Sequence, residues 1–161
     1  TQTEPGKGSV FNLFFPRYSP AQVPAPRTKP KGMVKGNAHI LLVDDEPVLV
    51  RVGKKMLERL GYRVSAFESP LAALSTVKKD PDAFDLVITD MTMPEIHGTE
   101  LAGQIKQLNP RIPVILATGF ANISQSEDAD TDMIDAILPK PVEMGTLSRT
   151  VDHVLSNALE S

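Results

Sequence analysis

The 161-residue chain contains no cysteine and no tryptophan, and aromatic residues make up only 5% of it. The absence of cysteine excludes disulfides, cysteine-ligated zinc and thiol catalysis, and it fits a cytoplasmic protein. No apolar run approaches the roughly 20 residues that a membrane-spanning helix needs. No secretory signal is visible at the N-terminus. We therefore expect a cytoplasmic location and no contact of this chain with a membrane.

Acidic residues are nearly missing from the first part of the chain. Residues 1–36 carry six Lys or Arg and one acid, whereas residues 37–161 carry eleven and nineteen, so the net charges are about +5 and −8. The acidic part is a poor candidate for binding nucleic acid. Basic residues in segment 17–36 are scattered among prolines and glycines, which predicts an extended linker. We expect a domain boundary near residue 37.

Beyond the linker, short apolar runs alternate with segments of helical periodicity. Strands are predicted at 39–43, 62–67, 85–89, 113–117 and 134–138, and helices at 47–60, 70–79, 98–108, 121–133 and 143–158. Pro47 suits the first turn of a helix, and Gly61 suits the left-handed position after one. Segment 121–133 is rich in Ser, Asp and Thr, so we expect a short, weakly held helix there.

This alternation predicts an α/β fold, a doubly wound five-stranded parallel sheet with helices on both faces. In the strand order 2-1-3-4-5, the first and third strands are neighbours and leave a ligand crevice at their carboxyl ends. Asp44 and Asp45 follow the first strand, and Asp90 follows the apolar run of the third. The sequence therefore predicts three carboxylates in one crevice.

Carboxylates so close repel one another unless a cation intervenes, and a set of oxygen ligands suits Mg²⁺. Thr118 ends the fourth strand and Lys140 the fifth, so a hydroxyl and an amine can reach an oxyanion held at Asp90. The bond between Lys140 and Pro141 is a candidate for the cis form. This combination suits transient phosphorylation of Asp90. The plainer alternatives are a helix cap at Asp44, a turn residue at Thr118 and a surface lysine at Lys140.

The same residues carry a family resemblance. Over about residues 37–160, the order and spacing of these side chains are similar to the receiver domain of two-component response regulators. The loop Asp-Met-x-Met-Pro-x-x-x-Gly at 90–98 is typical of that family. The resemblance implies a flavodoxin-like receiver fold and a phosphoacceptor module that uses Mg²⁺.

Carried over to this chain, the resemblance makes Asp90 the phosphoacceptor, with Thr118 and Lys140 in contact with the phosphoryl group. Asp45 and Asp90 would bind Mg²⁺ directly, Asp44 would act largely through water, and the backbone carbonyl of Thr92 would be a further ligand. The implied metal set is Asp44, Asp45, Asp90 and Thr92.

Two departures from the family pattern concern the output of the domain. Many receivers carry an aromatic residue three positions before the lysine, where this chain has Ile137. An aromatic switch is therefore not expected, and signalling would rest on the fourth helix and its loops. The positions that tune water access to the phosphoryl group are Thr92 and Phe120. Neither side chain is well suited to orienting an attacking water, so we expect slow self-dephosphorylation.

Residues 5–16 resemble the end of the ATP-binding domain of sensor histidine kinases, where a Gly-x-Gly-[Thr/Ser]-x-Phe segment leads into the last strand. We interpret residues 1–16 as the remnant of that strand, 17–36 as a linker and 37–161 as the receiver. The parent chain would then be a hybrid histidine kinase. Its receiver would accept a phosphoryl group from phosphohistidine and either relay it or regulate the attached kinase. The expected partner is the kinase core or a histidine phosphotransfer protein, and a homodimer is possible.

Other interpretations remain open. One is a stand-alone response regulator, and another is a docking module that uses its first and last helices and is rarely phosphorylated. An aspartate-nucleophile phosphohydrolase would place Asp-x-Asp after the first strand, whereas this chain has Asp44-Asp45-Glu46. The histidines His39, His97 and His153 are scattered, and we expect them to be surface or loop residues without partners.

Overall fold

The computed structural model describes residues 2–4, 8–10, 38–119 and 133–160. The chain divides into two compact units, Thr1–Gly32 and Met33–Ser161. In the first unit, strand β1 (Gln2–Glu4) pairs antiparallel with strand β2 (Gly8–Val10). The second unit contains everything that bears on the candidate site.

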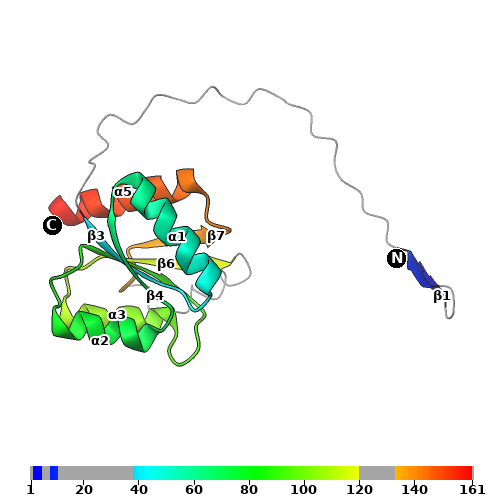
Figure 1. The fold of residues 1–161 in the computed structure, drawn as a ribbon, viewed down its shortest axis with the longest axis horizontal. Helices are drawn as coiled ribbons and strands as arrows, with labels where there is room; N and C mark the ends of the chain where they lie inside the picture. Colours follow the sequence, from blue (N-terminus) through cyan, green and yellow to red (C-terminus); the bar gives the residue numbers. More distant parts are fainter. Residues whose placement is uncertain (1, 5–7, 11–37, 120–132, 161) are drawn as a thin grey trace, which may run out of the picture. The chain divides into compact units, whose positions relative to one another are not determined.

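The second unit is built on a five-stranded parallel sheet (Figure 1). Its strands are β3 (His39–Val43), β4 (Arg63–Phe67), β5 (Leu86–Asp90), β6 (Val114–Gly119) and β7 (Ala136–Lys140). They lie in the order β4-β3-β5-β6-β7, and each neighbouring pair is parallel. The predicted order 2-1-3-4-5 is confirmed. The carboxyl ends of all five strands consequently meet at one edge. At that edge a crevice opens between β3 and β5, where the strand order reverses direction.

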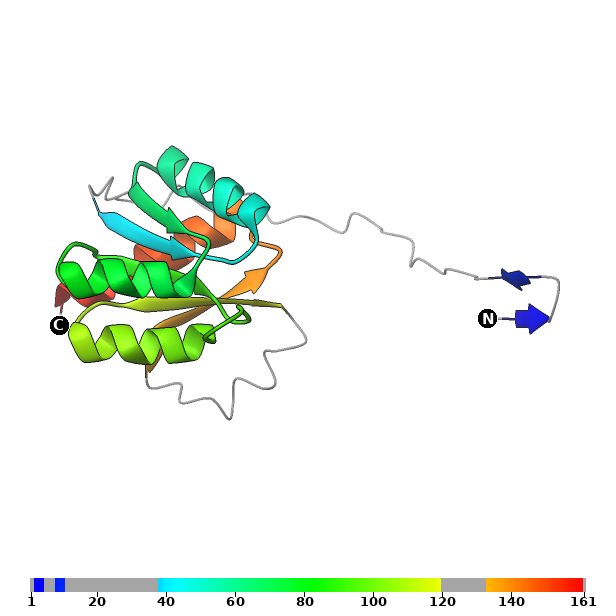
Figure 2. The same cartoon turned by 60° about the horizontal axis from the view of Figure 1, so that its bottom comes forward.

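Helices cover both faces of this sheet. They are α1 (Pro47–Leu60), α2 (Pro70–Lys79), α3 (Gly98–Leu108) and α5 (Met144–Glu160). Helices α1 and α5 lie on one face, and α2 and α3 lie side by side on the other (Figures 1 and 2). Among the described residues, no helix is long and apolar enough to cross a membrane.

The two residues that predicted the ends of the first helix lie at those ends in the structure. Pro47 opens α1, and Gly61 follows it with φ 99°, a left-handed conformation that glycine adopts without a Cβ penalty. The N–H of Gly61 donates to the carbonyl of Glu58 at 3.0 Å, and that of Tyr62 to the carbonyl of Leu57 at 3.2 Å. These bonds end α1 and direct the chain into β4.

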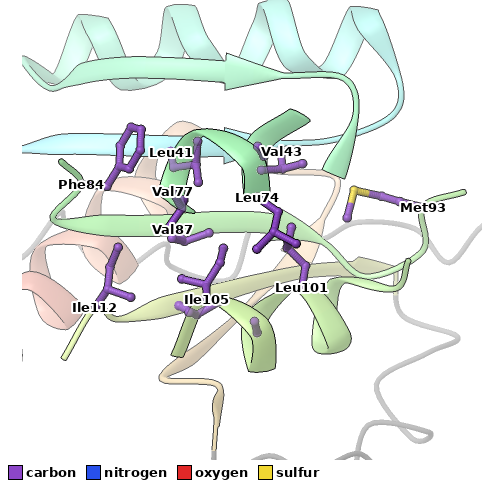
Figure 3. Close-up of a cluster of buried hydrophobic side chains, with 13 residues drawn as sticks. Leu41, Val43, Leu74, Val77, Phe84, Val87, Met93, Leu101, Ile105 and Ile112 are labelled. Atoms are coloured by element: carbon purple, nitrogen blue, oxygen red, sulfur yellow. The ribbon is translucent and has the colours of Figure 1, made fainter. Parts of the chain in front are cut away.

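Each face of the sheet carries its own buried apolar cluster. The cluster under α2 and α3 is drawn in Figure 3, where Leu74, Leu101 and Ile105 from the helices meet Val43 and Val87 from the strands. The cluster under α1 and α5 contains Ile40, Leu42, Leu57, Leu86, Ile88, Ile115, Leu138, Leu147, Val151 and Val154. Strands buried on both faces explain the nearly continuous apolar runs in the sequence.

The last strand begins later than the sequence predicts. Ile134 was expected to open it, but β7 starts at Ala136. The carboxylate of Asp135 accepts a hydrogen bond from the Val114 N–H at 2.8 Å, and the Asp135 N–H donates to the Val114 carbonyl. The Asp135 side chain thus takes the place of the first backbone partner in the pairing of β7 with β6. The helix predicted at 121–133 lies outside the described residues except for its last position.

Candidate functional site

Three carboxylates meet at the carboxyl edge of the sheet. Asp44 directly follows β3, Asp45 follows Asp44, and Asp90 is the last residue of the adjacent strand β5. One oxygen from each carboxylate lies within 4.8 Å of the others. Asp44 is 6% exposed and Asp90 8%, whereas Asp45 is exposed. The predicted convergence of these residues is therefore present, with two of the three charges largely removed from water.

Backbone N–H groups orient the two buried carboxylates. Asp44 Oδ1 accepts from the N–H of Glu46 at 3.0 Å, and Asp90 Oδ2 accepts from the N–H of Thr92 at 3.2 Å. These bonds leave the second oxygen of each carboxylate, Asp44 Oδ2 and Asp90 Oδ1, to contact other groups. Thr92 itself is exposed, and its contact with Asp90 runs through its amide rather than its side chain.

Lys140 lies between the two buried carboxylates. Its Nζ is 2.7 Å from Asp44 Oδ2 and 2.7 Å from Asp90 Oδ1. Burial by itself would lower the pKa of Lys140, but the hydrogen bonds to Asp44 and Asp90 and their negative charges outweigh it and raise the pKa. Lys140 therefore carries its positive charge inside the site. The peptide bond between Lys140 and Pro141 is cis, as the sequence suggested.

Thr118 comes from the next strand, β6, and is 1% exposed. Its hydroxyl lies 3.1 Å from the sulfur of Met91, to which it donates. Met91 directly follows Asp90, so the hydroxyl and the carboxylate belong to neighbouring strand ends. No sequence pattern indicated this contact between Met91 and Thr118, which lie 27 positions apart.

The loop after Asp90 returns to pack against the strand it left. Gly98 donates its N–H to the carbonyl of Met91 at 3.0 Å. A Cβ built on Gly98 would collide with the backbone carbonyl of Asp90 and lie 2.9 Å from a methyl group of Leu116. Glycine at this position thus allows the close approach that holds the loop beside the carboxylate.

The donor set suits a hard divalent cation. Asp44, Asp45 and Asp90 bring three negative charges together, and Lys140 supplies one positive charge in contact with them. Carboxylate oxygens with access to water on the Asp45 side are the ligands that Mg²⁺ prefers, because it retains several of its waters. The residues present therefore fit the cation that the sequence predicted.

An apolar groove adjoins the carboxylates. A cavity of about 490 Å³ is lined by Asp44, Asp90 and Lys140 and otherwise mostly by apolar residues. Its walls come from the strands, from α1, and from α5 with the segment that leads into it, and they include Leu49, Val52, Met56, Pro141, Val142 and Leu147. On α1, the side chains of Val48, Leu49 and Val52 are 51%, 37% and 48% exposed. We call these three residues the α1 patch.

The histidines only partly follow expectation. His97 and His153 are exposed, and His153 lies 3.3 Å from the amide of Asn157. The expectation that the histidines lack partners was wrong for His153 and for His39. The Nδ1 of His39 donates to the carbonyl of Ala83 at 2.8 Å, and its Nε2 lies 2.8 Å from the Ser65 hydroxyl. His39 is the first residue of β3, at the opposite edge of the sheet from the carboxylates, and none of the three histidines enters the candidate site. Phe120 lies outside the described residues.

Comparison with known proteins identifies the family. The model of the response regulator receiver domain matches residues 40–152. The response regulator receiver protein CpdR of Brucella abortus is 32% identical over 116 residues, which cover 72% of this chain and 95% of CpdR. The sensor kinase CckA of the same species is 29% identical over 161 residues, which cover 95% of this chain and 17% of CckA. The chain thus spans only about a sixth of that kinase.

Solved structures agree with the sequence comparison. A response regulator receiver domain protein from Clostridium thermocellum superimposes with a TM-score of 0.70 at 30% identity, over 74% of this chain and 95% of that one. The family match covers the sheet except for its first residue, His39, and includes Asp44, Asp90, Thr118 and Lys140. The chain belongs to the response regulator receiver domain family.

Proposed function

We propose that this receiver accepts a phosphoryl group from a phosphohistidine onto Asp90 in the presence of Mg²⁺. The observation that carries the proposal is the position of Lys140, whose Nζ is 2.7 Å from both Asp44 and Asp90. A half-buried cation in contact with the acceptor carboxylate can neutralise phosphoryl oxygens as they arrive. Thr118 adds a hydroxyl from the adjoining strand.

The transfer is a displacement at phosphorus. An Asp90 oxygen forms a bond to phosphorus while the bond from phosphorus to the imidazole nitrogen breaks and its electron pair stays on the imidazole. Asp44, Asp45, Asp90 and the Thr92 carbonyl would hold Mg²⁺, which when bound supplies charge for the phosphoryl oxygens. Lys140 and Thr118 orient the group, so positioning and charge provide most of the catalysis.

Phosphotransfer also requires a place for the partner that carries the phosphohistidine. The α1 patch and the groove beside Asp90 offer an apolar surface next to the site, since Leu49 and Val52 line the same cavity as Asp90. An exposed apolar patch next to a charged site favours docking of a protein rather than entry of a small substrate. We propose that the histidine kinase core or a histidine phosphotransfer protein docks there.

We further propose that the parent chain is a hybrid histidine kinase. The match to CckA covers 95% of this chain, which leaves about eight residues outside it, so it extends through most of residues 1–36. A receiver matched through its own domain alone would leave that segment uncovered, as the match to CpdR does at 72%. The segment also contains the residues that resemble the end of a kinase ATP-binding domain. The coding sequence upstream of Thr1 should therefore encode such a domain, and an unrelated upstream sequence would contradict this origin.

Phosphorylation of Asp90 is tested by incubating the chain with Mg²⁺ and acetyl phosphate and measuring the intact mass. We expect one added phosphoryl group in the wild type and none in Asp90→Asn. Asp85→Asn, at the opposite edge of the sheet, is the matched control and should accept one group. An adduct that persists in Asp90→Asn would identify a different acceptor. No adduct in the wild type despite Mg²⁺ binding would favour the docking module, the second candidate, which the α1 patch supports.

The lifetime of the phosphorylated form is a separate prediction. Because the exposed Thr92 contacts Asp90 through its amide, its side chain is not fixed in a position that would orient an attacking water. We therefore expect slow self-dephosphorylation. A half-life of only seconds, unchanged when Thr92 or Phe120 is replaced, would argue against this expectation.

A further inference from the structure

The hydroxyl of Thr118 has a specific partner in this structure, the thioether of Met91. The distance from Oγ1 to Sδ is 3.1 Å, and the alternative acceptor, the carbonyl of Gly119, is 3.4 Å away. A hydroxyl has one proton and donates to one acceptor at a time. Because Thr118 is 1% exposed, water has little access to take over that bond.

Backbone hydrogen bonds hold the main chain of Met91 at both its amide and its carbonyl group. Its N–H donates to the carbonyl of Ala117 at 2.9 Å, and its carbonyl accepts from the N–H of Gly98 at 3.0 Å. Ala117 directly precedes Thr118 on β6, so the same pair of strands carries the sulfur and the hydroxyl. The contact is therefore set by the sheet and by the loop that carries Asp90, rather than by a mobile side chain on the surface.

We propose that Met91 is a positioning residue that holds the Thr118 hydroxyl until Asp90 is phosphorylated and then releases it to the phosphoryl group. This inference rests on the proposed function. A thioether is a weak acceptor, whereas a charged phosphoryl oxygen is a strong one, so the exchange favours the phosphorylated state. The bond to sulfur nevertheless has to be broken, and it therefore weakens binding of the phosphoryl group.

When the Thr118 hydroxyl leaves the Met91 sulfur for the phosphoryl group, the change also affects the loop that carries Met91. The position that many receivers fill with an aromatic switch residue is Ile137, which is 38% exposed. A movement of Thr118 is transmitted instead to the side chain that it touches, Met91, and through Met91 to the loop that ends at Gly98. Met91 thus links the phosphoryl site to the start of α3.

The test uses beryllofluoride, a phosphoryl analogue, with Mg²⁺ present and calorimetry as the readout. Met91→Leu keeps the volume but removes the acceptor, so it should bind beryllofluoride about three- to tenfold more tightly than the wild type, the gain expected when one neutral hydrogen bond no longer competes. Met93→Leu is the matched control, because Met93 lies in the same loop but packs in the apolar core (Figure 3). Its affinity should equal that of the wild type.

Two further variants separate positioning from general effects of packing. Met91→Gln restores an acceptor on an unbranched side chain and should bring the affinity back to the wild-type value or below it. In a Thr118→Ala background, Met91→Leu should change nothing, because the hydroxyl is absent. Equal affinities of the wild type and Met91→Leu, or the same gain without Thr118, would overturn the role of Met91. A wild type that binds no beryllofluoride would overturn the proposed function and this inference with it.

Discussion

The two edges of the sheet both carry aspartates, but in opposite settings. At the amino edge, Asp85 accepts from the N–H of His39 at 2.6 Å, and Asp135 accepts from the N–H of Val114 at 2.8 Å. At the carboxyl edge, Asp44 and Asp90 each accept one backbone hydrogen bond and share Lys140 as well. The amino edge spaces its charges along separate strand starts, whereas the carboxyl edge gathers them.

Under the proposed function, the difference separates carboxylates that build the fold from carboxylates that bind Mg²⁺. An aspartate that receives an N–H at a strand start satisfies a donor that the sheet leaves unpaired. Three carboxylates within 4.8 Å of one another exceed what two backbone donors and one lysine require. Such a cluster repels itself and reduces stability, which is consistent with the Mg²⁺ site that we propose.

The largest expected effect comes from breaking the carboxyl edge at Gly98. Gly98→Ala should destabilise the domain by about 3 kcal/mol, because the new Cβ collides with the backbone carbonyl of Asp90. It should also slow phosphorylation by acetyl phosphate, because the loop beside Asp90 must move. Gly145→Ala, where the nearest atom is 3.9 Å away in α5, should leave stability equal or slightly higher. Urea unfolding of the two variants measures this contrast, and equal stabilities would contradict it.

A smaller effect is expected at the amino edge. Asp135→Ala should cost about 2 kcal/mol, because it leaves the N–H of the buried Val114 without its acceptor and Lys106 without its ion pair at 3.0 Å. Phosphorylation of Asp90 should be unaffected in the folded protein. Chemical denaturation and intact mass measure the two outcomes. A stability equal to that of the wild type would show that the amino-edge aspartate is dispensable for the fold.

The smallest effect is expected at Tyr62, whose hydroxyl donates to Asp152 of α5 at 2.7 Å. Burial raises the pKa of Tyr62, and the hydrogen bond and the negative charge of Asp152 raise it further. The unfolded chain loses this proton near its ordinary pKa of about 10, whereas the folded chain retains it. The contribution of Tyr62 is therefore complete below about pH 10 and is lost as the pH rises through the raised pKa. Tyr62→Phe should cost about 1 kcal/mol at neutral pH and flatten the fall in stability above about pH 10. Denaturation at several pH values measures both.

The sequence predicted those features that depend on local signals. Pro47 and Gly61 mark the ends of α1 because their backbone preferences act at their own positions. The meeting of Asp44, Asp90 and Lys140 could be predicted as well, because parallel strands with right-handed crossovers place their carboxyl ends at one edge.

What the sequence did not indicate depends on contacts between distant side chains. The bond from Thr118 to Met91, the partners of His39 and the bond from Tyr62 to Asp152 join positions between 26 and 90 residues apart. No periodicity or turn preference marks such pairs. The late start of β7 has the same origin, since a side chain of Asp135 takes the place of a backbone partner.

Thermal unfolding with and without Mg²⁺ tests most directly whether the two edges have different tasks. Mg²⁺ at ten times its Kd should stabilise the wild type by about 1.4 kcal/mol and raise the unfolding midpoint. Asp90→Asn should lose this response, whereas Asp135→Asn should start from a lower midpoint and keep the full response. An Asp90→Asn variant that still responds fully to Mg²⁺, or an Asp135→Asn variant that does not, would contradict the assignment of the carboxyl edge to binding and the amino edge to the fold.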